Sequence, residues 1–207
     1  PLPSPGESGG HWRKLPEGWK GKGPQGSPQI GRTWVKRGKG KMKDFVKLYP
    51  HQADFVSAVG KLPEGGGIIA AHGTGTGKTI SSIAAFEDLK QQGKASRALV
   101  IAPAGLRGNY LEKGVNKFTD SKGMIVTNPD QVVPDDVEYV ITSYAVFRNN
   151  PDGFLQNYLP DTVIADEFHR AGNPGGKTNK ALRRASEVVP RFMGLTASIS
   201  QNDPSDI

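Results

Sequence analysis

The sequence predicts a three-layer α/β domain with a mainly parallel sheet over residues 48–207, preceded by a basic Gly/Pro-rich arm over residues 1–47. Two observations predict the domain. Apolar runs of four or five residues recur from Leu48 onward, and amphipathic stretches separate them. Short apolar runs that alternate with helices are typical of parallel strands, because helices then cover both faces of the sheet. A length of 207 residues suits one such domain.

The elements follow in order along this domain. Pro50 suits the first turn of a helix, and Phe55, Val56 and Val59 then share one face. Strands are expected at 67–71, 98–102, 124–127, 139–142, 162–165 and 192–195, and further helices at about 78–90, 106–118, up to 147, and 177–188.

The positive charge lies in the front segment. Residues 1–47 hold eleven Lys or Arg against three acids, together with ten Gly, six Pro and all three Trp of the chain. This composition buries too little apolar surface to offset the entropy of ordering the backbone, so we expect a flexible arm. Two interpretations stay open: the arm contacts nucleic acid through its cations and Trp rings, or it is a solvated linker.

Several classes of protein are disfavoured. No apolar run approaches the roughly 18 residues that a membrane span requires, and the start PLPSPGESGG lacks the charged and apolar regions of a signal peptide. Without Cys the chain forms no disulfide, thiolate metal site or cysteine nucleophile. We therefore expect a cytoplasmic or nucleoid-associated protein that is not secreted and has no membrane partner. Because the first residue is Pro, we also expect a piece of a longer chain.

The strongest functional signal is AHGTGTGKT at 71–79, between a predicted strand and a predicted helix. Its glycines let backbone N–H groups turn toward one centre, and the helix N-terminus adds the positive end of its dipole. Lys78 would reach the β and γ phosphates of a nucleotide, and the Thr79 hydroxyl would bind Mg²⁺. The strict pattern has Gly where this chain has His72, and the alternative is a Gly-rich turn with an incidental Lys. The predicted nucleotide-binding residues of the loop are Gly73, Thr74, Gly75, Thr76, Gly77, Lys78 and Thr79.

A second signal stands at the end of the predicted strand 162–165, which runs into DEFHR. Ligands bind beyond the carboxyl ends of strands in open α/β sheets. Asp166 would hold Mg²⁺, and Glu167 would orient or deprotonate the attacking water. Alone, such a pair is often the acidic start of a helix. His169 is a candidate for coupling the nucleotide site to Gln52 or Thr196, although a lone His is more often structural.

In this order the motifs resemble the first motor domain of superfamily-2 helicases and translocases, which has a RecA-like fold, over about Leu48 to Ala197. LYPHQADFV resembles the entry motif that places a Gln, here Gln52, against adenine. GTGKT is similar to motif I, ALVIAPAGLRGNY to motif Ia, DEFH to motif II and GLTAS to motif III. YVITSYAVF and the pair Asn109-Tyr110 resemble the Snf-type branch, which usually has Trp at the second of these positions.

The resemblance implies further roles. Residues near Pro103 to Arg107 and from Thr142 to Tyr144 would face a nucleic-acid backbone, and the alternative is ordinary strand-to-helix turns. Thr196 and Ser198 would link the ATP state to the nucleic-acid surface. In this family a second RecA-like domain, in cis or in trans, supplies arginine fingers. The chain would therefore bind ATP and Mg²⁺ but hydrolyse ATP poorly alone.

The implied activity is an ATPase, with Glu167 and Lys78 as its catalytic residues, that couples hydrolysis to movement on nucleic acid, with DNA favoured over RNA. Two alternatives stay open. The chain could be a binding or regulatory module that holds ATP and nucleic acid without useful turnover. It could also be a different nucleotide-binding enzyme that shares only the loop and the acidic strand end.

Overall fold

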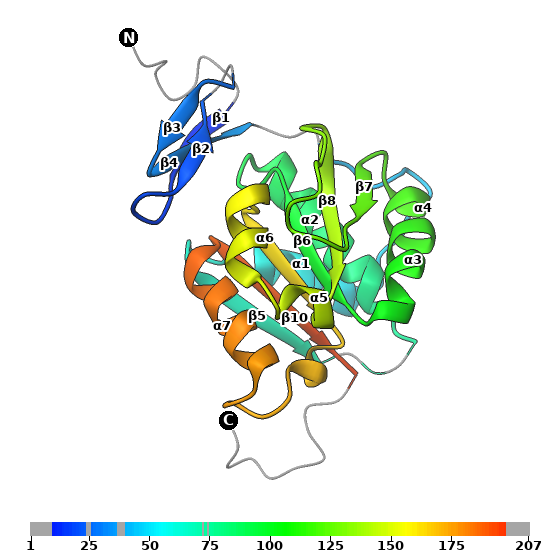
Figure 1. The fold of residues 1–207 in the computed structure, drawn as a ribbon. Coiled ribbons are helices and arrows are strands. Elements are labelled where there is room, and N and C mark those ends of the chain that lie inside the picture. The colour runs from blue at the N-terminus through cyan, green and yellow to red at the C-terminus, as the bar shows by residue number, and fades with distance from the viewer. Residues whose placement is uncertain (1–9, 24–25, 37–39, 72, 74, 198–207) are drawn as a thin grey trace.

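A six-stranded parallel sheet forms the centre of the molecule (Figure 1). The computed structural model describes residues 10–23, 26–36, 40–71, 73 and 75–197. The strand order is β5-β10-β9-β6-β8-β7, and every neighbouring pair is parallel. The strands are β5 (Gly66–Ala71), β6 (Ala98–Ala102), β7 (Lys122–Ile125), β8 (Val137–Ser143), β9 (Thr162–Asp166) and β10 (Arg191–Thr196). The predicted α/β class is confirmed.

Helices cover both faces of this sheet, and each layer encloses its own apolar core. Because side chains alternate along a strand, Val163 of β9 faces one core and Ile164 faces the other. No helix within the described ranges is long and apolar enough to cross a membrane. The first layer contains α1 (Pro50–Gly60), α2 (Lys78–Gln91), η1 (Ala104–Leu106), α3 (Arg107–Asn109), η2 (Tyr110–Val115) and α4 (Asn116–Phe118); the second contains η3 (Phe168–Ala171), α5 (Tyr144–Phe147), α6 (Pro151–Tyr158) and α7 (Lys177–Val188).

Several elements differ from the sequence-based expectations. β8 begins two residues before and ends one residue after the predicted 139–142. β7 begins and ends two residues before the predicted 124–127. The predicted helix 106–118 is a succession of short segments, of which η2 has the wider π-helical turn. The prediction lacked α6, although its local signals are present: the Asn150 side chain accepts a hydrogen bond from the Gly153 N–H, and Pro151 occupies the first turn.

The expected flexible arm is wrong for residues 10–23 and 26–36. These residues form two antiparallel ribbons, in which β1 (Gly10–Lys14) pairs with β4 (Arg32–Lys36) and β2 (Lys20–Lys22) pairs with β3 (Pro28–Ile30). We call residues 10–23 and 26–36 the N-terminal module. Figure 1 shows it beside the sheet, in blue.

Contacts with the α/β domain explain why the N-terminal module is ordered. Leu15 and Trp19 are 3% and 9% exposed and join the core that α6 and α7 form with the sheet. The buried Arg13 guanidinium donates a 2.8 Å hydrogen bond to the Pro160 carbonyl, just before β9. The apolar surface that orders these short strands is supplied largely by another part of the chain, so the composition of residues 1–47 alone does not reveal it. The module therefore lies at the amino-terminal edge of the sheet.

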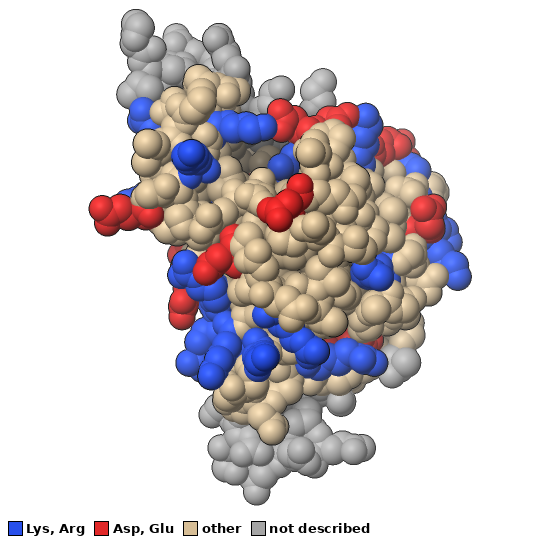
Figure 2. Space-filling model, in the orientation of Figure 1, with Lys and Arg blue, Asp and Glu red and all other residues tan. Residues whose placement is uncertain are grey.

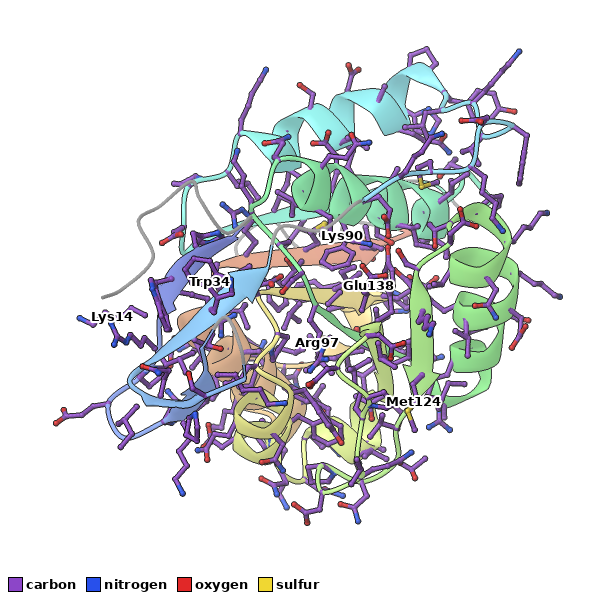
Figure 3. All side chains as sticks on the ribbon, turned by 90° about the horizontal axis from the view of Figure 1, so that it is seen from above. Lys14, Trp34, Lys90, Arg97, Met124 and Glu138 are labelled. Atoms are coloured by element: carbon purple, nitrogen blue, oxygen red, sulfur yellow. The ribbon has the colours of Figure 1, made fainter. Side chains whose placement is uncertain are left out.

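A buried ionic network fastens the chain between the module and α1 to helix α2. The Lys41 N–H donates a 2.9 Å hydrogen bond to the Glu87 carboxylate. Glu87 forms a 3.0 Å ion pair with Lys90, and both side chains are at most 2% exposed. Lys90 also lies 2.6 Å from a carboxylate oxygen of Glu138 on β8 (Figure 3). Because α2 follows the 71–77 loop, this network fixes the helix on which the candidate site is built.

Candidate active site

The loop between β5 and α2 makes two turns that only glycine accommodates well. Gly75 and Gly77 have φ angles of +79° and +83°, in the left-handed region. A Cβ atom on Gly77 would also lie 2.4 Å from the Gln52 amide nitrogen. Thr76 closes the loop, because its hydroxyl donates a 2.7 Å hydrogen bond to the Gly73 carbonyl. Two residues of interest, His72 and Thr74, lie outside the described residues.

Gln52 holds this loop from the side of α1. Its side chain is 2% exposed, and its amide nitrogen donates a 3.0 Å hydrogen bond to the Thr76 carbonyl. The amide oxygen accepts a 2.9 Å hydrogen bond from the N–H of Tyr49, at the start of the helix. His51 Nε2 lies 3.2 Å from the same Thr76 carbonyl. The structure thus places Gln52 against the backbone of the loop, and its contact with adenine stays a prediction.

The two strongest signals of the sequence meet at one point. β10 separates β5 from β9, and the carboxyl ends of these parallel strands lie at one edge of the sheet. Lys78 Nζ lies 3.6 Å from a carboxylate oxygen of Glu167, with exposed fractions of 9% and 22% for the two side chains. This ion pair joins the first residue of α2 to the residue that follows β9. It brings the candidate phosphate-binding Lys close to the candidate water-activating acid, and phosphoryl transfer uses both kinds of group.

Asp166 is the buried member of the acidic pair. It is 5% exposed, and its carboxylate accepts a 3.0 Å hydrogen bond from the Glu167 N–H. Burial raises the pKa of Asp166, and the neighbouring Glu167 charge raises it further. A bound cation would act in the opposite direction, because it favours the charged carboxylate. Glu167 itself has a φ of +54°, and a non-glycine residue in this region is typical of functional sites.

His169 connects this acidic pair to the end of β10. Its Nδ1 atom lies 3.3 Å from a Glu167 carboxylate oxygen and 3.3 Å from the Thr196 hydroxyl. Thr196 is the last residue of β10 and is 4% exposed. Of the two partners suggested for His169, the structure therefore brings Thr196 into contact with it. Ser198 lies outside the described residues.

A cavity of about 390 Å³ opens at this point, a size that small-molecule sites commonly have. Its donor set fits Mg²⁺, because the Thr79 hydroxyl and the Asp166 carboxylate are hard oxygen ligands. Among the described residues no group of three or more His, Cys, Asp or Glu could hold a metal, so phosphate oxygens and water would complete the shell. The lining residues are Gly75, Gly77, Lys78, Thr79, Leu106, Asn109, Tyr110, Lys113, Asp166 and Glu167.

A comparison with protein families identifies this arrangement. The model of the family described as "Type III restriction enzyme, res subunit" (ResIII) matches residues 45–201. The chain belongs to the ResIII family. It is the first RecA-like domain of a superfamily-2 helicase of the Snf type, a helicase ATP-binding domain.

Similar proteins of known name agree with this assignment. The ResIII chain is 30% identical over 152 residues to the ATP-dependent DNA helicase DDM1 of Arabidopsis thaliana, covering 67% of this chain and 20% of that protein. It is 29% identical over 181 residues to the DNA repair and recombination protein RAD54 of rice, covering 75% and 18%. The uncharacterized ATP-dependent helicase YqhH of Bacillus subtilis is 26% identical over 168 residues, covering 80% and 29%. The chain thus spans less than a third of the length of each.

Two solved structures share the fold. The SWI2/SNF2 ATPase core of Sulfolobus solfataricus in complex with double-stranded DNA has a TM-score of 0.63 and 22% identity, covering 84% of this chain and 36% of that chain. The ATPase core domain of the same organism's SWI2/SNF2 protein has a TM-score of 0.61 and 25% identity, covering 78% and 32%.

The residues expected to face nucleic acid are unequally exposed in the ResIII domain. Ala104 and Leu106 are exposed in the turn after β6, and the Arg107 guanidinium donates a 3.2 Å hydrogen bond to the Ala104 carbonyl. The side chains of residues 142–144, by contrast, are at most 8% exposed, and the Tyr144 hydroxyl donates a hydrogen bond to the Asp166 carbonyl. A side-chain contact between residues 142–144 and a phosphate is therefore disfavoured.

Sequence reasoning missed Lys113, which lines the cavity beside Lys78 and Glu167 from η2 of the ResIII domain. Lys113 stands four residues after Asn109, and residues at this spacing share one helix face. That spacing is the only local signal, and it becomes informative once Asn109 is known to line the cavity. The buried Tyr110 hydroxyl lies 2.9 Å from the Ser82 hydroxyl, so η2 is attached to α2 beside the site.

Proposed function

We propose that this chain is the ATP-binding half of a DNA-dependent ATPase that couples hydrolysis to movement on DNA. The observation that carries the proposal is the 3.6 Å approach of Lys78 to Glu167 in a cavity that Thr79 and Asp166 also line. Phosphate ligands, an oxygen donor set for Mg²⁺ and a water-activating carboxylate are then present at one edge of the sheet.

Each residue has a distinct task in this proposal. The loop amides and Lys78 hold the β and γ phosphates. Glu167 orients the attacking water and accepts its proton, while His169, 3.3 Å from the Glu167 carboxylate, is a positioning residue. Thr79 and Asp166 would hold Mg²⁺, which would supply positive charge to the phosphate oxygens.

The proposed motor requires a second RecA-like domain, supplied in cis or in trans. Nucleotide hydrolases generally gain about 10³ to 10⁵ in turnover from an arginine finger that reaches the phosphates from outside. The described residues that line the cavity include two lysines but no arginine. We therefore infer that the chain binds ATP well and turns it over slowly until a second domain closes the cavity.

DNA is the proposed nucleic-acid partner, in preference to RNA. The name of DDM1 describes a DNA helicase and that of RAD54 a DNA repair and recombination protein. The SWI2/SNF2 core of similar fold has been solved with double-stranded DNA. These similarities support DNA as the nucleic acid on which the proposed motor moves.

ATP hydrolysis, measured over a series of salt concentrations, tests the proposal. The chain alone should bind ATP with little turnover. A polypeptide that includes the second domain should hydrolyse ATP faster when DNA is added, and the stimulation should fall with rising salt because phosphate contacts release counterions. Comparison of the stimulation by single-stranded DNA, double-stranded DNA and RNA of equal length shows which nucleic acid the ATPase uses. Bound ATP without DNA-stimulated turnover would favour the non-hydrolysing binding module instead.

Replacement of Gln52 by alanine tests the proposed contact with adenine. We expect Q52A to weaken ATP binding about tenfold, the effect of losing roughly one net hydrogen bond. If Gln52 recognises the base, GTP binding should change much less than ATP binding. Nucleotide titrations of Q52A and of the control Q156A, which alters an exposed Gln on α6, measure both affinities. Equal losses for ATP and GTP would contradict base recognition and leave only the role of holding the loop at Thr76.

A further inference from the structure

We propose that α7 and the segments beside it carry a second DNA contact, which binds the sugar–phosphate backbone of a duplex. This inference rests on the proposed function and adds a surface that lies outside the predicted motifs. The surface consists of Arg148, Arg170, Lys177, Lys180 and Arg183, which we call the α7 basic surface. Figure 2 shows Lys and Arg gathered in a band over the face of the molecule that α7 covers.

All five side chains of the α7 basic surface are exposed. Among the described residues, no acid lies within ion-pair distance of any of them. The two acids close by, Asp152 and Glu187, lie within 4.0 Å of Arg184 instead. No acid of the described residues therefore compensates the positive charge of the α7 basic surface through an ion pair.

The sequence of α7 places these charges against the preference of the helix. Lys177 and Lys180 occupy the first turn, where the helix dipole is positive and acidic residues are favoured. The first turn contains no acid, and the N-cap residue Gly176 offers no side chain to the free N–H groups. Cations at this end of the helix destabilise the free protein. A bound polyanion would attract the same cations, so they would then stabilise the complex.

The spacing of the charges suits a polymer of phosphates. Lys177, Lys180 and Arg183 recur every third residue, so the row extends over about 9 Å along the helix. A duplex presents a phosphate charge for about every 1.7 Å of its axis, and the Arg guanidinium matches phosphate oxygens with two donors. Between these residues α7 exposes no large apolar side chain, which a protein partner would be expected to engage.

The α7 basic surface continues toward the edge of the sheet at which the candidate site lies. Arg148 directly follows α5, which begins after β8, and its guanidinium lies 3.5 Å from the Thr178 hydroxyl of α7. Arg170 belongs to η3, directly after the Asp166-Glu167 pair. If one strand of a duplex lies along the turn after β6, the duplex would therefore also contact the α7 basic surface, which belongs to the other layer of helices. Double-stranded DNA is for this reason the proposed ligand.

Neutralisation of α7 tests this inference in the full chain. K177Q/K180Q/R183Q should bind a short labelled DNA duplex ~10-fold more weakly, and the slope of log affinity against log salt should fall by about 0.9 for each lost phosphate contact. Binding of a single strand of the same length should change by less than about twofold, because in this proposal one strand occupies the turn after β6 and only a duplex also reaches α7. The matched control K47Q/K61Q/K117Q removes three exposed positive charges from other elements and should leave duplex binding within about twofold.

The possible results separate this inference from the proposed function. If the unaltered chain binds neither the duplex nor the single strand, the α7 contact is overturned, and DNA-stimulated hydrolysis by a polypeptide with the second domain decides the proposed function separately. If the chain binds DNA but the α7 variant matches the control, only the α7 contact is overturned. Equal losses for duplex and single strand would also overturn it. Thermal unfolding confirms that each variant folds, and K180Q/R183Q replaces the triple variant if the latter melts early.

Discussion

Replacement of Lys78 by alanine is expected to lower ATP affinity about 100-fold, because a hydrogen bond to a charged phosphate contributes roughly 1.5–3 kcal/mol. The location of Lys78 increases the effect. Its ammonium lies 3.6 Å from the Glu167 carboxylate, so its removal exposes the phosphates to an uncompensated negative charge. The loss of attraction and the new repulsion act in the same direction. Titration of the chain with a fluorescent ATP analogue in the presence of Mg²⁺ measures the change.

The fold should survive this replacement. Lys78 is the first residue of α2 and lies outside both apolar cores, and alanine is the best helix former. K61A, which removes an exposed Lys at the end of α1, is the matched control and should bind ATP like the unaltered chain. A folded K78A variant with unchanged affinity would contradict the assignment of the 73–79 loop as the phosphate site.

The strands of the sheet were predictable because their signal is local. β6 and α7 have the predicted bounds, and β9 exceeds its prediction by Asp166 alone, since apolar runs and helical spacing are properties of neighbouring residues. The N-terminal module was not predictable in this way. Leu15 and Trp19 of the module are buried against α6 and α7, which are distant in the sequence. No local pattern in a Gly-rich, basic segment predicts that contact.

The candidate site likewise contains residues that local patterns predict and residues that they do not. Lys78 and Glu167 belong to short motifs at strand ends, and the topology of a parallel sheet brings such ends to one edge. The contact of Gln52 with the Thr76 carbonyl and the presence of Lys113 in the cavity depend on how α1 and η2 are packed. Packing of this kind is set by side chains that are far apart in sequence, so residue patterns alone predict the chemistry better than its supporting contacts.

Replacement of Glu167 by glutamine should separate ATP binding from hydrolysis. The amide keeps the size of the side chain but accepts no proton, and general-base catalysis typically contributes 10²- to 10⁴-fold, so turnover should fall by about that factor. ATP affinity should be retained or rise, because a negative charge 3.6 Å from Lys78 is removed and Lys78 is left entirely to the phosphates. Steady-state hydrolysis with DNA, in a polypeptide that includes the second domain, measures turnover.

The Glu167 result is informative only if binding is measured on the same preparation. E64Q neutralises an exposed acid away from the cavity and should preserve both binding and turnover. A variant that loses ATP binding along with turnover would point to a damaged loop, because the Glu167 backbone adopts a left-handed φ of +54° next to Asp166. Full turnover by E167Q would reject Glu167 as the base. Loss of turnover with ATP still bound would mean that Glu167, at the end of β9, activates the water and does not bind the phosphates.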